Sequence, residues 1–334
     1  MNNWTSFRGE TGMRRKTGLR VMAFFLVLPG CAFGQATQKI PGLPNVPIDA
    51  TAEQAQQAVA IARAGKKLTP KGWPNGARVA VCISFDVDNE YLADAPPLPV
   101  PMSAGEYGAT TGLTRVLEML DRQQIPASFY IPAVSAILHP DMIKEIQKGN
   151  RHEIGVHGWI HEFPPLVGSA EKEEELLNRA IDYLTKATGK RPVGYRAPAW
   201  AFSPYTLGLL TKAGFLYDSS MMAMDQPYEL ISNGKDTGLL ELPVTWILDD
   251  YPYYGENADG SMPDPRSVFE VYKAEFDGAY EEKTLFLLTM HPHISGHRSR
   301  ITQVDKLITY MKSKPGVWFA TEEQVARYLQ QANK

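Results

Sequence analysis

Short apolar runs alternate with longer amphipathic segments over most of the 334-residue chain. The strand-like runs are 79–85, 127–131, 153–156, 193–195, 239–244, 285–290 and 317–320. The helix-like segments are 112–123, 141–148, 170–188, 204–213, 268–281, 304–312 and 322–331. Strands that alternate with helices predict a parallel sheet with helical crossovers, and therefore an α/β fold.

Polar side chains able to bind a ligand follow several of these strands. Asp86 and Asp88 follow the first strand, His157 the third, Arg196 the fourth and His291 the sixth. An open doubly wound sheet fits the alternation equally well. The carboxyl ends of barrel strands, however, converge on one face, where these side chains would meet. We therefore predict a (β/α) barrel over residues 77–334.

The first 34 residues have the pattern of an export signal. A basic segment at 14–20 precedes the apolar run 21–28, and Ala32-Phe33-Gly34 offers small residues for cleavage before Gln35. The apolar run is shorter than the roughly 20 residues that span a bilayer, so we expect no transmembrane segment. A buried helix is the plainer alternative. Lipidation at Cys31 ranks lower because Pro29 fits a lipobox poorly.

Residues 35–76 are rich in Pro, Gly, Gln and Ala, with one helix-like segment at 52–64, and we expect an N-terminal arm or linker there. The formal net charge is -3, and the body of the chain has no run of Lys or Arg. Nucleic-acid binding therefore has no support. The sequence leaves the oligomeric state open, and a homo-oligomer is compatible with it.

Two motifs suggest a metal site. In Ser84-Phe85-Asp86-Val87-Asp88, residues i and i+2 of an extended chain point the same way, so both acids face one pocket. A helix N-cap or a surface turn is an equal alternative for this motif alone. In His157-Gly158-Trp159-Ile160-His161, the i, i+4 spacing would place two imidazoles on one face of a helical turn. Two His and one carboxylate leave open positions on a metal ion, as in catalytic sites.

Two further motifs suggest acid–base groups. Met290-His291-Pro292-His293 follows an apolar run, and a histidine there titrates close to neutral pH. His293 and His297 are candidates for surface or substrate-binding residues. Arg196, within Gly194-Tyr195-Arg196-Ala197-Pro198, is either a fixed partner for a carboxylate or a surface charge.

These four motifs, in their order along the chain (Asp86, His157, Arg196 and then His291), resemble the polysaccharide deacetylase family, also called the NodB-homology or carbohydrate esterase family 4 group. The resemblance covers about residues 78–330. It implies a distorted (β/α) barrel with one divalent metal ion, usually zinc. It also implies the following roles: Asp86 as catalytic base, Asp88, His157 and His161 as metal ligands, Arg196 as partner of the base, and His291 as general acid.

The chain departs from the usual family pattern in two places. Adjacent aspartates are usual, whereas Val87 separates them here and Asn89-Glu90 follow. The family's Asp–Trp motif is represented by Asp218 without the tryptophan. Together with Glu241 and Asp249-Asp250, these features resemble a branch that holds peptidoglycan-deacetylase-like proteins and hydrolases of allantoin and cyclic imides. The expected substrate is an N-acetylated glycan or a small cyclic amide.

Other classes of function are weaker interpretations. An iron oxygenase uses the same two-His, one-carboxylate ligands, but usually on an antiparallel β scaffold. A sugar-binding protein without turnover could stack Trp159 and Trp200 on sugar faces, although such aromatics are more often core residues. An export signal weighs against a small-ring substrate, because small-molecule nitrogen metabolism is usually cytoplasmic.

The export signal gives the first prediction. In a native-like host the mature protein is expected to begin near Gln35 and to lie outside the cytoplasm, in the periplasm or medium. Intact-mass analysis of the purified protein checks the new terminus. An uncleaved chain in the cytosol would contradict export and favour the cyclic amide substrate.

Overall fold

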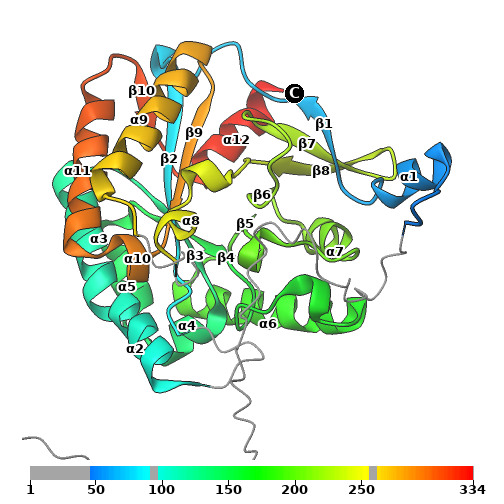
Figure 1. The fold of residues 1–334 in the computed structure, drawn as a ribbon, viewed down its shortest axis with the longest axis horizontal. Helices are drawn as coiled ribbons and strands as arrows, with labels where there is room; N and C mark the ends of the chain where they lie inside the picture. The colour runs from blue at the N-terminus through cyan, green and yellow to red at the C-terminus, as the bar shows by residue number, and fades with distance from the viewer. Residues whose placement is uncertain (1–45, 91–96, 256–261, 334) are drawn as a thin grey trace, which may run out of the picture. The chain divides into compact units, whose positions relative to one another are not determined.

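The computed structural model describes residues 46–90, 97–255 and 262–333 (Figure 1). Residues 1–34, the expected signal peptide, lie outside this part. The strands are β1 Arg63–Lys67, β2 Val79–Asp86, β3 Ser128–Ile131, β4 Glu153–Val156, β5 Gly194–Tyr195, β6 Tyr217–Asp218, β7 Tyr228–Ser232, β8 Lys235–Glu241, β9 Leu285–Met290 and β10 Val317–Phe319. The α-helices are α1 Ala52–Ala58, α2 Pro99–Tyr107, α3 Leu113–Gln123, α4 Ala133–Leu138, α5 Met142–Gln147, α6 Ala170–Thr188, α7 Thr206–Ala213, α8 Tyr251–Tyr254, α9 Pro265–Glu282, α10 Pro292–Ser295, α11 Arg298–Lys312 and α12 Glu322–Ala332.

In this part of the chain the strands form one curled, mixed sheet. Its order is β1-β7-β8-β6-β5-β4-β3-β2-β10, and β9 pairs with β2. Strands β2 to β6 pair in parallel in order along this path, and β7 is antiparallel to both β8 and β1. A parallel bridge between Asp249 and Thr289 connects the segment after β8 to β9. The sheet is thus a distorted (β/α) barrel, as predicted, and not an open doubly wound sheet.

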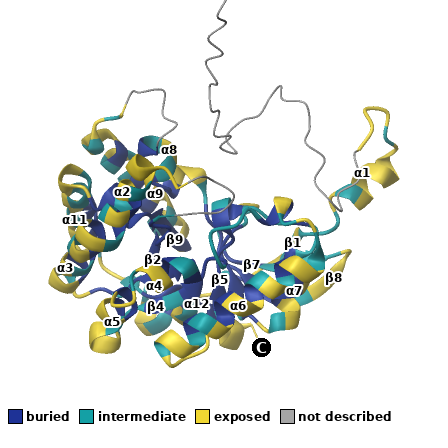
Figure 2. Cartoon of the chain, turned by 90° about the horizontal axis from the view of Figure 1, so that it is seen from below, coloured by how far each residue is buried: buried dark blue, intermediate teal, exposed yellow. Residues whose placement is uncertain are grey.

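The residues of strand β2 point alternately to the outer and the inner side of the barrel. All eight of its residues are buried, because helices cover one face and the barrel interior the other. Alternate residues from Val79 to Phe85 join the outer core under the helices, while Ala80 and Cys82 join the inner core. Figure 2 shows β2 and β9 buried, with exposed residues on the helices around them. The same alternation directs Asp86 to the inner side.

The outer and inner cores are closed by different helices. Helices α9 and α11 pack against each other, and α11 also contacts α3, on the outer side of β2 and β9 (Figure 1). The closing helix α12 instead packs Val325, Ala326 and Leu329 into the inner core. Its first turn therefore reaches the barrel interior. In the described residues, no helix has the length and apolar character that crossing a membrane requires.

The segment expected as an arm contributes to the sheet. The helix expected over 52–64 ends at Ala58, and Arg63–Lys67 forms edge strand β1. Leu68 and Trp73 are 2% and 3% exposed in the inner core. The sequence Arg-Ala-Gly-Lys-Lys did not suggest a strand because an edge strand needs no apolar face and often carries lysine. Strands β6 and β7 and helices α2, α4, α8 and α10 were also missed; α2 has nine residues, and none of the others has more than six.

Trp73 provides a test of whether residues 35–76 belong to the folded domain. Its ring lies 6.0 Å from Trp318 and 6.1 Å from Tyr328, and its Nε1 donates to the Lys283 carbonyl at 3.2 Å. We expect Trp73→Ala to lower the free energy of unfolding by about 3–5 kcal/mol, measured by denaturant unfolding. Val59→Ala, at an exposed position of the same segment, is the control and should change it by less than about 0.5 kcal/mol. A change in Trp73→Ala as small as that in Val59→Ala would mean that the segment is a dispensable arm.

Candidate metal and active site

Asp86 and Asp88 lie on the same side of the chain at the end of β2. Asp86 is the last residue of the strand, and the amide of Val87 donates to the Tyr130 carbonyl at 2.8 Å. The Val87 side chain is fully buried in the outer core, so the aspartates on either side of it point inward. The residue between the two acids is therefore a packing residue that preserves the alternation. Asn89, with φ of 52°, turns the chain away.

The two histidines of His157-Gly158-Trp159-Ile160-His161 come together through a loop. The helical turn that we expected is absent: positive φ at Gly158 (77°) and His161 (58°) breaks the helical path. The carboxylate of Glu162 accepts from the amides of Trp159 and Ile160 at 2.9 Å each. This carboxylate holds the loop in place. The spacing of residues in the sequence could not reveal this role of Glu162.

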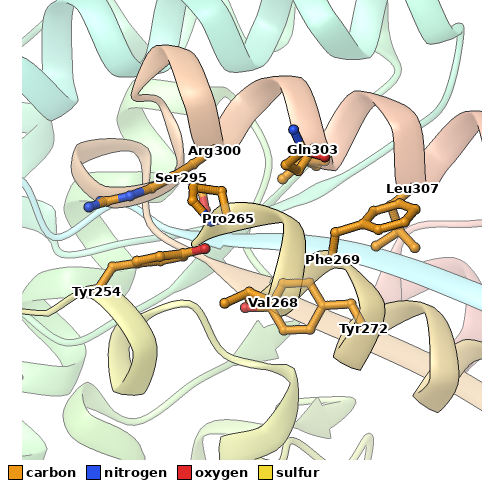
Figure 3. Close-up of a pocket in the computed structure, with 10 residues that line it drawn as sticks. Tyr254, Pro265, Val268, Phe269, Tyr272, Ser295, Arg300, Gln303 and Leu307 are labelled. Atoms are coloured by element: carbon orange, nitrogen blue, oxygen red, sulfur yellow. The ribbon is translucent and has the colours of Figure 1, made fainter. Parts of the chain in front are cut away.

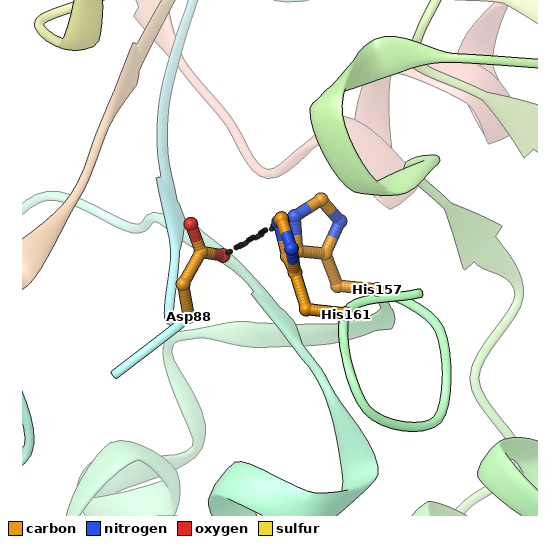
Figure 4. A group of neighbouring side chains, drawn as sticks. All are labelled: Asp88, His157 and His161. Carbon is orange, nitrogen blue, oxygen red and sulfur yellow. Dashed lines mark ion pairs between the residues drawn. The ribbon is translucent and has the colours of Figure 1, made fainter. Parts of the chain in front are cut away.

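Asp88, His157 and His161 form a compact group of ligand atoms (Figure 4). Oδ1 of Asp88 lies 3.3 Å from His157 Nε2 and 3.6 Å from His161 Nε2. Two ligands at 2.0–2.1 Å from one tetrahedral zinc ion are roughly 3.3 Å apart, so these separations suit a shared ion. The ligand atoms of all three residues lie within 4.8 Å of one another.

The protonation of the group also fits a cation. His157 Nδ1 donates to the Arg196 carbonyl at 2.8 Å, which leaves Nε2 facing Asp88. Burial opposes protonation of His157, but Asp86 and Asp88 raise its pKa above the ordinary value. Asp88 Oδ1 is buried and accepts no hydrogen bond. Burial works against ionisation of Asp88, but the three nearby imidazoles, led by that of His161, hold its pKa well below the usual range. An ionised oxygen facing ring nitrogens is where a divalent cation would be stabilised.

Arg196 is fully buried and uses every donor of its guanidinium. Nη1 donates to Asp86 Oδ1 at 2.8 Å and to Ser84 Oγ at 3.0 Å. Nη2 donates to Ser219 Oγ at 2.9 Å and to Glu322 Oε1 at 3.0 Å, and Nε donates to the Ser219 carbonyl at 2.9 Å. The Asp86 oxygen that remains is Oδ2, which lies 3.9 Å from His157 Nε2. The base predicted from sequence and its predicted partner are thus in contact.

His291 reaches the group from the end of β9. Its Nε2 lies 3.6 Å from Asp88 Oδ2, and its Nδ1 donates to Asp250 Oδ1 at 2.6 Å. The other oxygen of Asp250 accepts from the His291 amide at 3.0 Å and from Ser295 Oγ. Burial opposes protonation of the ring, yet Asp250 raises the pKa of His291 well above its ordinary value. Asp250 belongs to the Asp249-Asp250 pair seen in the sequence, where no role could be assigned to it.

A second set of ligand-type atoms belongs to Asp249, Asp250 and His291, also within 4.8 Å of one another. Hydrogen bonds already fill this set, because His291 and Ser295 donate to Asp250 and the Tyr251 amide donates to Asp249 at 3.1 Å. Burial raises the pKa of Asp249 to about 8, against the opposing charge of His291. We therefore interpret it as a proton-holding cluster and not as a second metal site.

The two tryptophans proposed as substrate-binding residues lie in structural contacts. The guanidinium of Arg179 covers one face of Trp159 at 4.1 Å. Trp200 is 9% exposed and stacks on Trp246, with 4.4 Å between ring centroids. Neither has a contact with the site that the structure records, although Trp246, which is more exposed, covers Trp200. The packing of Trp200 comes from a residue 46 positions away, which sequence reasoning could not foresee.

Of the remaining polar residues considered from the sequence, one lies beside His291 and the others contact residues outside the metal site. His293 is partly buried beside His291, 5.5 Å between ring centroids, and its Nδ1 is buried without a hydrogen-bond partner. His297 is exposed and stacks on Tyr107. Glu90 pairs with His139 at 2.9 Å. Asp218 and Glu241 are fully buried and both accept the Ser220 amide, at 3.1 and 3.0 Å.

A small cavity lies between α9 and α11, next to the proton-holding cluster of Asp249, Asp250 and His291 (Figure 3). Its lining includes Tyr254, Tyr272, Ser295 and Arg300, and its volume is about 10 Å³. That space holds about one water molecule and no substrate. It adjoins the site through Ser295, the residue that donates to Asp250.

Comparison with known proteins agrees with this arrangement. The polysaccharide deacetylase family model matches residues 103–217. The chain is 30% identical over 257 residues to a peptidoglycan deacetylase of Helicobacter pylori, covering 68% of this chain and 87% of that protein. A Mycobacterium smegmatis crystal structure assigned to the polysaccharide deacetylases has a TM-score of 0.74 at 35% identity, over 81% of this chain and 96% of that one. The crystal structure of Puue allantoinase gives 0.69 at 27% identity, over 78% and 92%.

The sequence identity to the Helicobacter pylori protein and the structural similarity to the Mycobacterium smegmatis protein indicate the same family. The matched region contains the loop of His157 and His161 together with Arg196, while Asp86 and His291 lie outside the family model. The chain belongs to the polysaccharide deacetylase family and is a polysaccharide deacetylase-like hydrolase that acts on carbon–nitrogen bonds.

Proposed function

We propose that this protein is a metal-dependent amide hydrolase that removes N-acetyl groups from a polysaccharide or from peptidoglycan. The observation that supports this most is the buried Oδ1 of Asp88, which accepts no hydrogen bond and faces two imidazole nitrogens. The Asp86–Arg196 pair and the His291–Asp250 pair adjoin it on either side. The similarity to a peptidoglycan deacetylase supports the proposed substrate class.

In this proposal Asp88, His157 and His161 hold one divalent ion, with zinc expected. Three protein ligands leave a position for water and substrate, as in catalytic zinc sites. When bound, such an ion supplies Lewis-acid polarisation of the amide carbonyl and makes water more acidic.

The proton transfers are assigned to two groups with different surroundings. Asp86 Oδ2 takes a proton from the attacking water, while Arg196 holds Oδ1 in place. His291 gives a proton from Nε2 to the leaving nitrogen, while Nδ1 stays bonded to Asp250. A carboxylate that accepts and an imidazolium that donates suit the opposite tasks of base and acid.

A second candidate is the hydrolysis of a small cyclic amide by the same residues. The structural similarity to an allantoinase supports it. We favour the glycan because residues 1–34 carry the pattern of an export signal, and we propose that the protein acts in the periplasm or outside the cell.

A substrate panel tests the proposed function. Purified protein is incubated with N-acetylglucosamine oligomers, peptidoglycan and a set of cyclic imides and ureides, and acetate release and ring opening are followed separately. We expect acetate release from the glycans, and none from the matched Asp86→Asn variant. Ring opening without acetate release would select the second candidate, and no turnover of any compound would contradict both.

The metal site predicts that the two aspartates fail in different ways. Asp88→Asn, like His157→Ala, should lower metal content measured by elemental analysis, because an amide oxygen is a neutral and poorer donor. Asp86→Asn should keep its metal and lose about 10²–10⁴ in kcat on metal-saturated enzyme, the usual contribution of a general base. Metal loss in Asp86→Asn together with full metal in Asp88→Asn would reverse the assignments.

The Asp250–His291 bond predicts a pH effect. A raised pKa keeps His291 protonated at neutral pH, and activity that needs the proton is lost as pH rises through that pKa. Asp250→Asn removes the stabilising charge, so the alkaline limb of the kcat profile should move to lower pH. Ser295→Ala removes one hydrogen bond to Asp250 but no charge, and should move the limb less. An unchanged limb in Asp250→Asn would exclude His291 as the acid.

A further inference from the structure

Glu322, the first residue of α12, contacts the same guanidinium as the proposed base. Its Oε1 accepts from Arg196 Nη2 at 3.0 Å, while Nη1 of Arg196 donates to Asp86. The side chains of Glu322 and Arg196 have no exposed surface. Neither the family motifs nor the spacing of polar residues after strands pointed to Glu322, because it begins a helix more than 200 residues after Asp86.

Glu322 is itself held on all sides. Its Oε2 accepts from the Tyr130 hydroxyl at 2.7 Å, and its amide donates to Ser128 Oγ at 2.9 Å. The ring of Tyr130 lies under the guanidinium, 4.1 Å from Cζ of Arg196. The hydroxyl of Tyr217 lies 2.8 Å from that of Tyr130 and donates to Glu153 at 2.6 Å. The guanidinium therefore sits in a pocket whose walls are fixed by several independent bonds.

The number of charges in this pocket exceeds what neutralisation requires. Asp86 alone would balance Arg196, so a second buried carboxylate adds a desolvation cost without being needed for charge balance. Burial raises the pKa of Glu322, and the charge of Arg196 opposes that rise. The geometry gives the second carboxylate a use: a guanidinium held at both Nη atoms and at Nε cannot rotate away from Asp86.

We propose that Glu322 is a positioning residue for the base. It fixes the orientation of Arg196, and through it the carboxylate of Asp86, so that Oδ2 stays directed at the attacking water. This inference rests on the proposed role of Asp86. It assigns to α12 a part in catalysis besides closing the inner core.

The matched pair Glu322→Gln and Glu323→Gln tests this role. Both residues begin α12, but the Glu323 carboxylate pairs with Lys190 and Arg327 near the surface. On metal-saturated enzyme, kcat of Glu322→Gln should fall between about tenfold and 10²-fold, the scale of loss when a catalytic group is misplaced. KM and metal content should stay at wild-type values, and Glu323→Gln should match wild type. Full kcat in Glu322→Gln, or an equal loss in Glu323→Gln, would overturn the proposal.

A double-mutant cycle on unfolding measures the same coupling without any substrate. Asp86→Asn and Glu322→Gln each leave Arg196 one carboxylate, whereas the double variant leaves it none. The double variant should therefore lose more unfolding free energy than the two single losses combined. If the loss in the double variant equals the sum of the two single losses, Asp86 and Glu322 are not coupled through Arg196, and the proposal is overturned. Coupling without turnover of any compound in the panel would overturn the proposed function and leave the Glu322–Arg196–Asp86 coupling established.

Discussion

The arrangement of the site depends on one buried guanidinium. Arg196 lies inside the barrel with no exposed surface, and its donors reach the end of β2, the segment after β6 and the start of α12. A buried cation is stable only when its donors are matched by acceptors, so the three segments must take their places together. The backbone carbonyl of the same residue also sets the ring of His157. One residue thus connects the proposed base with the proposed metal ligands.

Much of the fold could be predicted because period and length are local signals. The bounds expected for β4, α6 and β9 agree with the structure, since each is a single run with clear ends: Ser169 and Gly189, for example, cap α6. Polar residues after consecutive strands also indicated one shared face, because the carboxyl ends of parallel strands meet. Asp86 and Asp88 lie together for the local reason that was expected, the alternation of an extended chain.

The supporting residues could not be predicted, because each acts across a long stretch of sequence. Asp250 bonds a histidine 41 positions away, and Glu322 bonds an arginine 126 positions away. The sequence around Glu322 does not distinguish it from a surface carboxylate, and the resemblance that included Asp250 gave it no role. Trp73 shows the same limit for the fold, since its neighbours Trp318 and Tyr328 come from the end of the chain. Local patterns locate groups that react, and long-range packing determines what holds them.

Strand β2, which ends at Asp86, pairs with β9 and β10, and the Arg196 guanidinium donates to Glu322 at the start of α12. A nascent chain lacking its final few dozen residues therefore has a β2 without two of its partners and an arginine without one of its carboxylates. Synthesis from the N-terminus brings these segments out last, so folding of the barrel and assembly of the site finish only after the whole chain has emerged. Under the proposed export, the chain would therefore cross the membrane before its barrel and its site are complete.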